Sequence, residues 1–93
     1  MQQPQIWLVE DEQSIADTLV YMLQQEGFVV SVFARGLPAL DAARHRMPDL
    51  AILDVGLPDI SGFELCRQLL GRYPTLPVLF LTARSEELDK LLG

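Results

Sequence analysis

The chain has 93 residues, of which 49% are apolar and 22% charged, and its formal net charge at pH 7 is −6. This is the length and composition of one small globular domain, and the acidic balance argues against a nucleic-acid surface, because duplex binding depends mainly on Lys and Arg. The single cysteine, Cys66, excludes an internal disulfide and a cysteine metal cage. We expect neither a membrane span nor a signal peptide, and therefore a cytoplasmic location.

The first part of the chain alternates between two patterns of apolar residues. Residues 6–9, Ile-Trp-Leu-Val, form a continuous apolar run, which is typical of a strand buried on both faces. From Ile15 onward, the apolar positions 15, 19, 22 and 23 fall on one face of a helix that ends at Gly27. The β-branched and aromatic residues of 29–33 predict a second strand.

A second helix is expected to begin at Gly36 and to run to Met47, because Pro48 disfavours a helical residue before it. The side chains that this helix is expected to bury are Leu37, Leu40, Ala43 and Met47. Residues 50–53 are again continuously apolar and predict a third strand, which stops at Asp54.

The rest of the chain repeats the alternation. Ser61, with Glu64 three residues later, predicts a capping box at the start of a third helix. The residues expected to face the core from this helix are Phe63, Cys66, Leu69 or Leu70, and Tyr73. Residues 78–81 predict a fourth apolar strand, and Ser85 is the expected N-cap of a last helix that extends to Leu92.

Strands and helices that alternate through short connections favour a parallel sheet, because right-handed crossovers place the helices on both of its faces. We therefore expect one α/β domain over residues 1–93, with no boundary inside it. In open sheets of this kind, ligands bind beyond the carboxyl ends of the strands. The residues that directly follow the strands are thus the first candidates for a functional site.

Polar side chains follow three of the four predicted strands. Glu10 and Asp11 come after the first strand, Asp54 after the third and Thr82 after the fourth. If these strands are neighbours, the carboxylates converge, and two like charges ~4 Å apart repel by about 4 kcal/mol at an effective dielectric constant of about 20. A hard cation such as Mg²⁺, which prefers oxygen ligands, would offset this repulsion.

A carboxylate beside Mg²⁺ can also attack phosphorus in line and form an aspartyl phosphate, and Thr82 would be placed to hydrogen-bond a phosphoryl oxygen. Simpler interpretations remain open. Asp54 could be a turn residue or a helix cap, Glu10 and Asp11 could cap the first helix, and Thr82 could be an ordinary strand-end residue.

Three segments together resemble the motifs of bacterial response-regulator receiver domains of the OmpR/PhoB type. They are residues 8–12 (LVEDE), 52–62 (ILDVGLPDISG) and 79–84 (LFLTAR). The resemblance implies a flavodoxin-like (CheY-like) doubly wound parallel sheet with the strand order 2-1-3-4. It also implies that residues 1–93 form a truncated receiver domain, because the fifth strand and fifth helix of the family are missing.

The resemblance implies a role for each matching residue. Asp54 would be the phosphoacceptor and Asp11 a direct Mg²⁺ ligand, whereas Glu10 would act on the metal through water. Gly56 would offer its backbone carbonyl to the metal. Thr82 would be the switch hydroxyl that moves toward the phosphoryl group.

Two further positions complete the comparison with the family. Ala83 would be the small neighbour that leaves room for the switch hydroxyl. The family lysine that salt-bridges the phosphoryl group has no counterpart, because the only lysine, Lys90, lies in the expected fourth helix and matches no motif.

The implied function is that of a switch. A sensor histidine kinase would donate the phosphoryl group, and a DNA-binding output domain outside these residues would respond, with no membrane and no enzymatic turnover beyond self-phosphorylation and self-dephosphorylation. The missing lysine keeps a phosphorylation-independent interaction module open, and an aspartyl-phosphate hydrolase is a third alternative. Self-association is expected through the apolar edge strand at residues 78–81 or through a receiver dimer.

Overall fold

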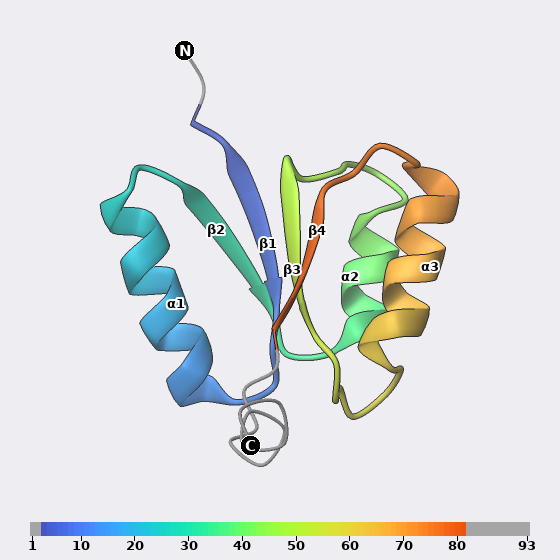
Figure 1. The fold of residues 1–93 in the computed structure, drawn as a ribbon, viewed down its shortest axis with the longest axis horizontal. Coiled ribbons are helices and arrows are strands. Elements are labelled where there is room, and N and C mark those ends of the chain that lie inside the picture. The colour runs from blue at the N-terminus through green and yellow to red at the C-terminus, as the bar shows by residue number, and fades with distance from the viewer. Residues whose placement is uncertain (1–2, 82–93) are drawn as a thin grey trace, which may run out of the picture.

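The computed structural model describes residues 3–81. Strands and helices alternate along the chain as β1 (Gln5–Val9), α1 (Gln13–Gln25), β2 (Val29–Phe33), α2 (Gly36–Ala42), β3 (Leu50–Asp54), α3 (Gly62–Arg72) and β4 (Val78–Leu81) (Figure 1). This is the predicted order of elements. The predicted last helix, from Ser85 to Leu92, lies outside the described residues.

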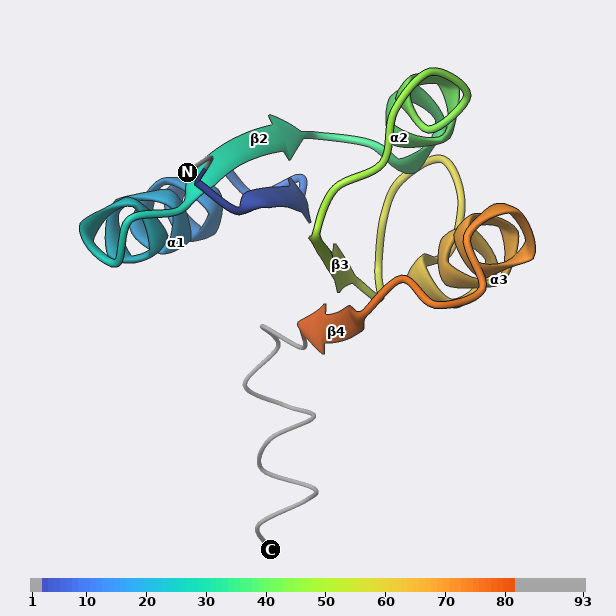
Figure 2. The ribbon, with the colours of Figure 1, turned by 90° about the horizontal axis from the view of Figure 1, so that it is seen from above.

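The four strands form a parallel sheet in the order β2-β1-β3-β4, which confirms the predicted topology. β1 is one of the two inner strands, and its Leu8 is the register partner of Val32 in β2 and of Ile52 in β3. Figure 2 shows α1 on one face of the sheet and α2 with α3 on the other. Because helices cover both faces of the sheet, the inner strands have continuously apolar sequences.

The main core lies between the sheet and the pair α2 and α3. Its buried residues are Trp7, Val9, Ala39, Ala43, Ala51, Leu53, Leu65, Leu69 and Leu76. Trp7 is 2% exposed, and its ring meets that of Phe33 edge-on, with 5.1 Å between the centroids. Within residues 3–81, no helix combines the length and the apolar character needed to cross a membrane.

The second helix is shorter than predicted. α2 ends at Ala42 rather than at Met47, and the chain continues in turns. The carbonyl of Ala43 accepts a hydrogen bond from the Tyr73 hydroxyl, so it points toward α3 at the place where the helix stops. Leu37 and Met47, expected to be buried, are 53% and 44% exposed, so that part of the prediction is wrong.

The buried face of α3 includes Leu69, as predicted, but otherwise differs from the prediction. Gly62, Leu65 and Leu69 are its buried residues, whereas Phe63 is 60% exposed. The reason is that the helix begins with Gly62 packed against the end of β3, which turns the positions three and seven residues later toward the sheet. Phe63 lies beside these buried positions, and the centroid of its ring is 5.0 Å from that of Phe80.

Candidate functional site

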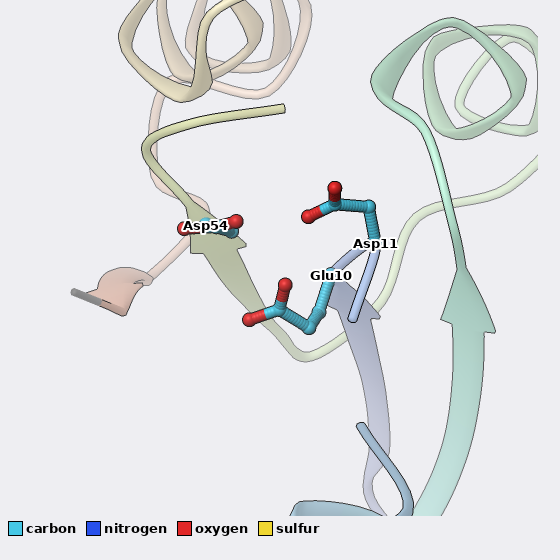
Figure 3. A group of neighbouring side chains, drawn as sticks. All are labelled: Glu10, Asp11 and Asp54. Atoms are coloured by element: carbon cyan, nitrogen blue, oxygen red, sulfur yellow. The ribbon is translucent and has the colours of Figure 1, made fainter. Parts of the chain in front are cut away.

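The pairing of β1 with β3 brings together the carboxylates that follow these strands. Val9 and Leu53 are register partners near the strand ends, Glu10 and Asp11 come directly after Val9, and Asp54 is the last residue of β3. Carboxylate oxygens of Glu10, Asp11 and Asp54 all lie within 4.8 Å of one another. Figure 3 shows the three side chains gathered between the ends of the two strands. We call these three residues the acidic cluster.

The members of the acidic cluster differ in exposure. Glu10 is buried, with 2% of its surface exposed, whereas Asp54 is half-buried and Asp11 is exposed. The cluster thus has a dry side formed by Glu10 and a side open to solvent at Asp11. Asp54 keeps part of its surface accessible to solvent.

Glu10 shows how unfavourable this environment is for a negative charge. Its Oε2 accepts a hydrogen bond from the Glu12 amide at 3.1 Å, but its buried Oε1 has no hydrogen-bond partner in the part of the chain that the structure describes. Burial raises the pKa of Glu10 to about 7; the Glu12 amide opposes this rise and the charge of Asp54 adds to it.

A hard cation suits these groups. Glu10 would otherwise bind a proton near neutral pH, because a buried carboxylate needs a compensating partner. Three convergent carboxylates, one of them with an unpartnered buried oxygen, form the kind of oxygen donor set that divalent cations such as Mg²⁺ prefer. The residues present therefore fit such an ion.

The loop between β3 and α3 closes tightly around the end of β3. The Gly62 amide donates to the Val55 carbonyl at 2.9 Å, and a Cβ at Gly62 would lie only 2.1 Å from the carbonyl oxygen of Asp54, so position 62 has no room for a side chain. The Gly56 amide lies 3.4 Å from Oδ1 of Asp54, which places the Gly56 peptide beside the acidic cluster.

The remaining predicted site residues fall outside the described part of the chain. Thr82 and Ala83 follow directly after Leu81, whose register partner in β3 is Asp54. Lys90 also lies outside the described residues. The roles given to Thr82 and Ala83 therefore stay predictions.

The structure adds one residue that sequence analysis did not single out. The carboxylate of Asp59 accepts hydrogen bonds from the amides of Gly36, at 2.9 Å, and Leu37, at 2.8 Å. It thereby ties the loop after Asp54 to the first turn of α2. The sequence shows only an aspartate in a loop, and its partners more than 20 residues away carry no local signal.

Comparison with known sequences gives one consistent result. Residues 6–91 match the family model described as "Response regulator receiver domain". The chain is 77% identical over its full length to the transcriptional regulatory protein CreB of Escherichia coli. It is 47% identical over 97% of its length to the phosphate regulon regulatory protein PhoB of Rhizobium meliloti. It spans only 41% and 40% of the lengths of these relatives.

Solved structures agree with the sequence matches. A CheY-like receiver domain of Methanospirillum hungatei has a TM-score of 0.84 at 26% identity, over 89% of this chain and 66% of that one. The response regulator TrrA of Thermotoga maritima, solved with Mg²⁺-BeF, has a TM-score of 0.84 at 32% identity, over 90% of this chain and 73% of that one. The OmpR/PhoB homologue DrrB, also of Thermotoga maritima, has a TM-score of 0.80 at 31% identity, over 97% of this chain and 40% of that one. Sequence and fold therefore point to the same family.

Proposed function

The chain belongs to the response-regulator receiver domains, and on that basis we propose that Asp54 accepts a phosphoryl group from a sensor histidine kinase in a Mg²⁺-dependent reaction. The observation that carries the proposal is the acidic cluster, in which Glu10 has a buried oxygen without a partner among the described residues. A site that needs a cation and presents a half-buried aspartate at a strand end suits phosphoryl transfer.

Four residues would hold the ion. Asp11 and Asp54 would bind through their carboxylates and Gly56 through its backbone carbonyl, while Glu10 would act through water. Bound Mg²⁺ would neutralise the charge that develops on the transferred phosphoryl group. The Mg²⁺-BeF complex named for the related TrrA supports an ion of this kind here.

The protein's own residues orient the acceptor. β3 holds Asp54 at the end of the sheet, and the Gly56 amide donates to its Oδ1. A carboxylate oxygen of Asp54 attacks the phosphorus of a phosphohistidine: a P–O bond forms as the P–N bond breaks, and the electron pair of that bond returns to the imidazole nitrogen. The products are an aspartyl phosphate and a neutral histidine on the kinase.

The relatives also support a proposal for the whole protein. Thr82 would move its hydroxyl toward the new phosphoryl group, whose charge of about −1.5 to −2 changes the local electrostatics. Because the two relatives are named as regulatory proteins and extend well beyond the matched region, an output domain that binds DNA would carry the response. The protein would act in the cytoplasm, as a switch and not as an enzyme with turnover.

The proposal is tested by incubating the chain with labelled acetyl phosphate and Mg²⁺. We expect label on the wild-type chain, none on Asp54→Ala, and wild-type labelling of Asp41→Ala, a control that removes an exposed aspartate of α2 whose partner is Arg44. Chelation of Mg²⁺ should abolish the label. A label that survives Asp54→Ala would overturn the assignment.

The labelling experiment and a turnover assay separate the two alternatives. An interaction module that works without phosphorylation would bind Mg²⁺ and take up no label. A hydrolase would turn over a generic phosphomonoester above the background rate, and this turnover would be lost in Asp54→Ala. Either result would overturn the proposed switch.

A further inference from the structure

The start of α2 is capped by a residue from a distant part of the chain. The N-cap residue of this helix, Arg35, makes no side-chain capping hydrogen bond. Instead, Oδ1 of Asp59 accepts from the Gly36 amide at 2.9 Å and Oδ2 accepts from the Leu37 amide at 2.8 Å. Both oxygens of Asp59 are thus used to satisfy amides that a helix leaves free at its first turn.

The same contact is reinforced by apolar packing. Gly36 is buried, and a Cβ at this position would lie 2.4 Å from the Cγ2 methyl of Ile60 and 3.5 Å from Cδ1 of Leu57. Three residues of the loop between β3 and α3 therefore meet the first residue of α2. A side chain at position 36 would push the Ile60 side chain away, so glycine lets the loop come this close.

This loop has anchors at its base and at its far side, and Gly56 lies between them. At the base, Gly62 packs against the Asp54 carbonyl and donates to the Val55 carbonyl. At the far side, Asp59 holds the loop to α2. Gly56 itself is exposed and carries no side chain that could fix its backbone, so apart from the contact of its amide with Asp54 its position depends on these anchors.

We propose that Asp59 is a positioning residue for the phosphoacceptor site: by capping α2 it fixes the loop that brings the Gly56 peptide beside the carboxylate of Asp54. The inference rests on the proposed function, in which Gly56 and Asp54 hold the cation. Asp59 acts through the loop and not on the ion, because both of its oxygens are engaged with α2.

Asp59 is ionised, and a carboxylate accepts the hydrogen bonds of the two α2 amides at any pH in the neutral range. Its limited burial opposes ionisation, but the amides of Leu37 and Gly36 outweigh it, and the pKa of Asp59 stays below its ordinary value. The carboxylate is therefore ionised throughout the neutral range.

The test follows individual amides by NMR. In metal-free protein, Asp59→Ala should speed hydrogen exchange of the Gly36 and Leu37 amides and shift the Gly56 signal. In a Mg²⁺ titration followed at the Gly56 signal, Asp59→Ala should need about fivefold more Mg²⁺ than wild type for half-saturation. Losing a residue that contacts and orients a metal ligand typically lowers metal affinity about 10- to 100-fold, and Asp59 contacts no ligand directly, so its effect should be smaller. Asp59→Asn, which keeps one acceptor oxygen, should fall between Asp59→Ala and wild type.

Tyr73→Phe is the matched control for this test. It removes a hydrogen bond at the opposite end of α2, from the Tyr73 hydroxyl to the Ala43 carbonyl, and should leave the Mg²⁺ titration unchanged. The role of Asp59 is overturned if Asp59→Ala and Asp59→Asn titrate like wild type, or if Tyr73→Phe shifts the titration equally. A wild-type chain whose Gly56 signal ignores Mg²⁺ would overturn the proposed function itself, together with this inference.

Discussion

At the scale of single residues, Glu10 is the only charged or polar side chain that the structure buries within residues 3–81. It lies one position beyond the inner strand β1. One of its carboxylate oxygens accepts a hydrogen bond from the Glu12 amide, and the other has no hydrogen-bond partner in this part of the chain. Placing a carboxylate there costs stability whenever it is ionised, because neither water nor a full set of donors compensates its charge. The metal-free protein should therefore respond to pH through this residue.

Glu10→Gln should flatten the pH dependence of stability. The pKa of Glu10 in the folded chain, about 7, lies above its ordinary value of 4.5, so the folded state keeps a proton that the unfolded state releases. The resulting stabilisation is fully present below the unfolded pKa and is lost as the pH rises through 7. The loss is on the order of 3 kcal/mol in the wild-type chain, and glutamine, which cannot ionise, should not show it.

Urea unfolding at several pH values between 4.5 and 8, with a chelator present, would measure this difference. We expect the free energy of unfolding to fall with rising pH in the wild-type chain and to change much less in Glu10→Gln. Parallel pH profiles for the two proteins would contradict the assignment of a raised pKa to Glu10.

At the scale of elements, the two glycines of α3 have opposite roles. A Cβ at Gly62 would lie 2.1 Å from the Asp54 carbonyl oxygen and 2.9 Å from Cα of Val55, and both of these atoms belong to the backbone. A Cβ at Gly71, near the other end of the helix, would have no atom within 4 Å. The start of α3 is therefore fixed by close backbone contact, and its end is not.

This contrast gives a paired prediction. Gly62→Ala should destabilise the chain by about 3 kcal/mol, because the backbone of β3 would have to move away. Gly71→Ala should stabilise it by roughly 0.5 kcal/mol, since alanine favours the helix and meets nothing. Equilibrium unfolding of both variants would measure these two changes in the free energy of unfolding. A Gly62→Ala protein as stable as wild type would show that the end of β3 tolerates displacement.

The inner strands β1 and β3 could be predicted because helices cover both of their faces, and this burial is visible in the sequence as an unbroken apolar run. The outer strands β2 and β4 are partly exposed and were predicted from their β-branched, aromatic and apolar residues. The acidic cluster could be predicted for a related reason: parallel strands end at one edge of the sheet, so Glu10, Asp11 and Asp54 had to meet once β1 and β3 were neighbours. Both predictions depend on short stretches of sequence and on one rule of topology.

The errors arise where contacts join distant segments. α2 stops early where the carbonyl of Ala43 meets Tyr73, and α3 turns Leu65 rather than Phe63 inward because Gly62 packs on β3. The tie from Asp59 to α2 was missed for the same reason. Helical periodicity and proline positions describe a helix by itself and do not contain such partners.

At the scale of the whole molecule, the outer strand β4 leaves apolar surface uncovered. β4 pairs with β3 along one edge, and the structure shows no strand on its other edge among residues 3–81. Leu79 and Phe80 are 56% and 44% exposed. A strand edge with apolar side chains readily pairs with another chain.

We therefore expect the 93-residue chain, prepared by itself, to self-associate as its concentration rises. Leu79→Lys should shift it toward the monomer, because a charge on an edge strand opposes pairing. Leu37→Lys is the control, since Leu37 is 53% exposed but lies on a helix. Gel filtration over a range of concentrations would test this, and a clean wild-type monomer at high concentration would contradict it.

The central place of β1 also matters during synthesis on the ribosome. β1 leaves the exit tunnel before the other three strands and can pair with β2 once Phe33 has emerged, but its other edge must wait for β3, which ends at Asp54. At about 5 to 20 residues per second, this interval lasts on the order of one to four seconds. During that time the nascent chain exposes an apolar strand edge, and its emerging acidic residues have no partner strand end with which to form a cation site.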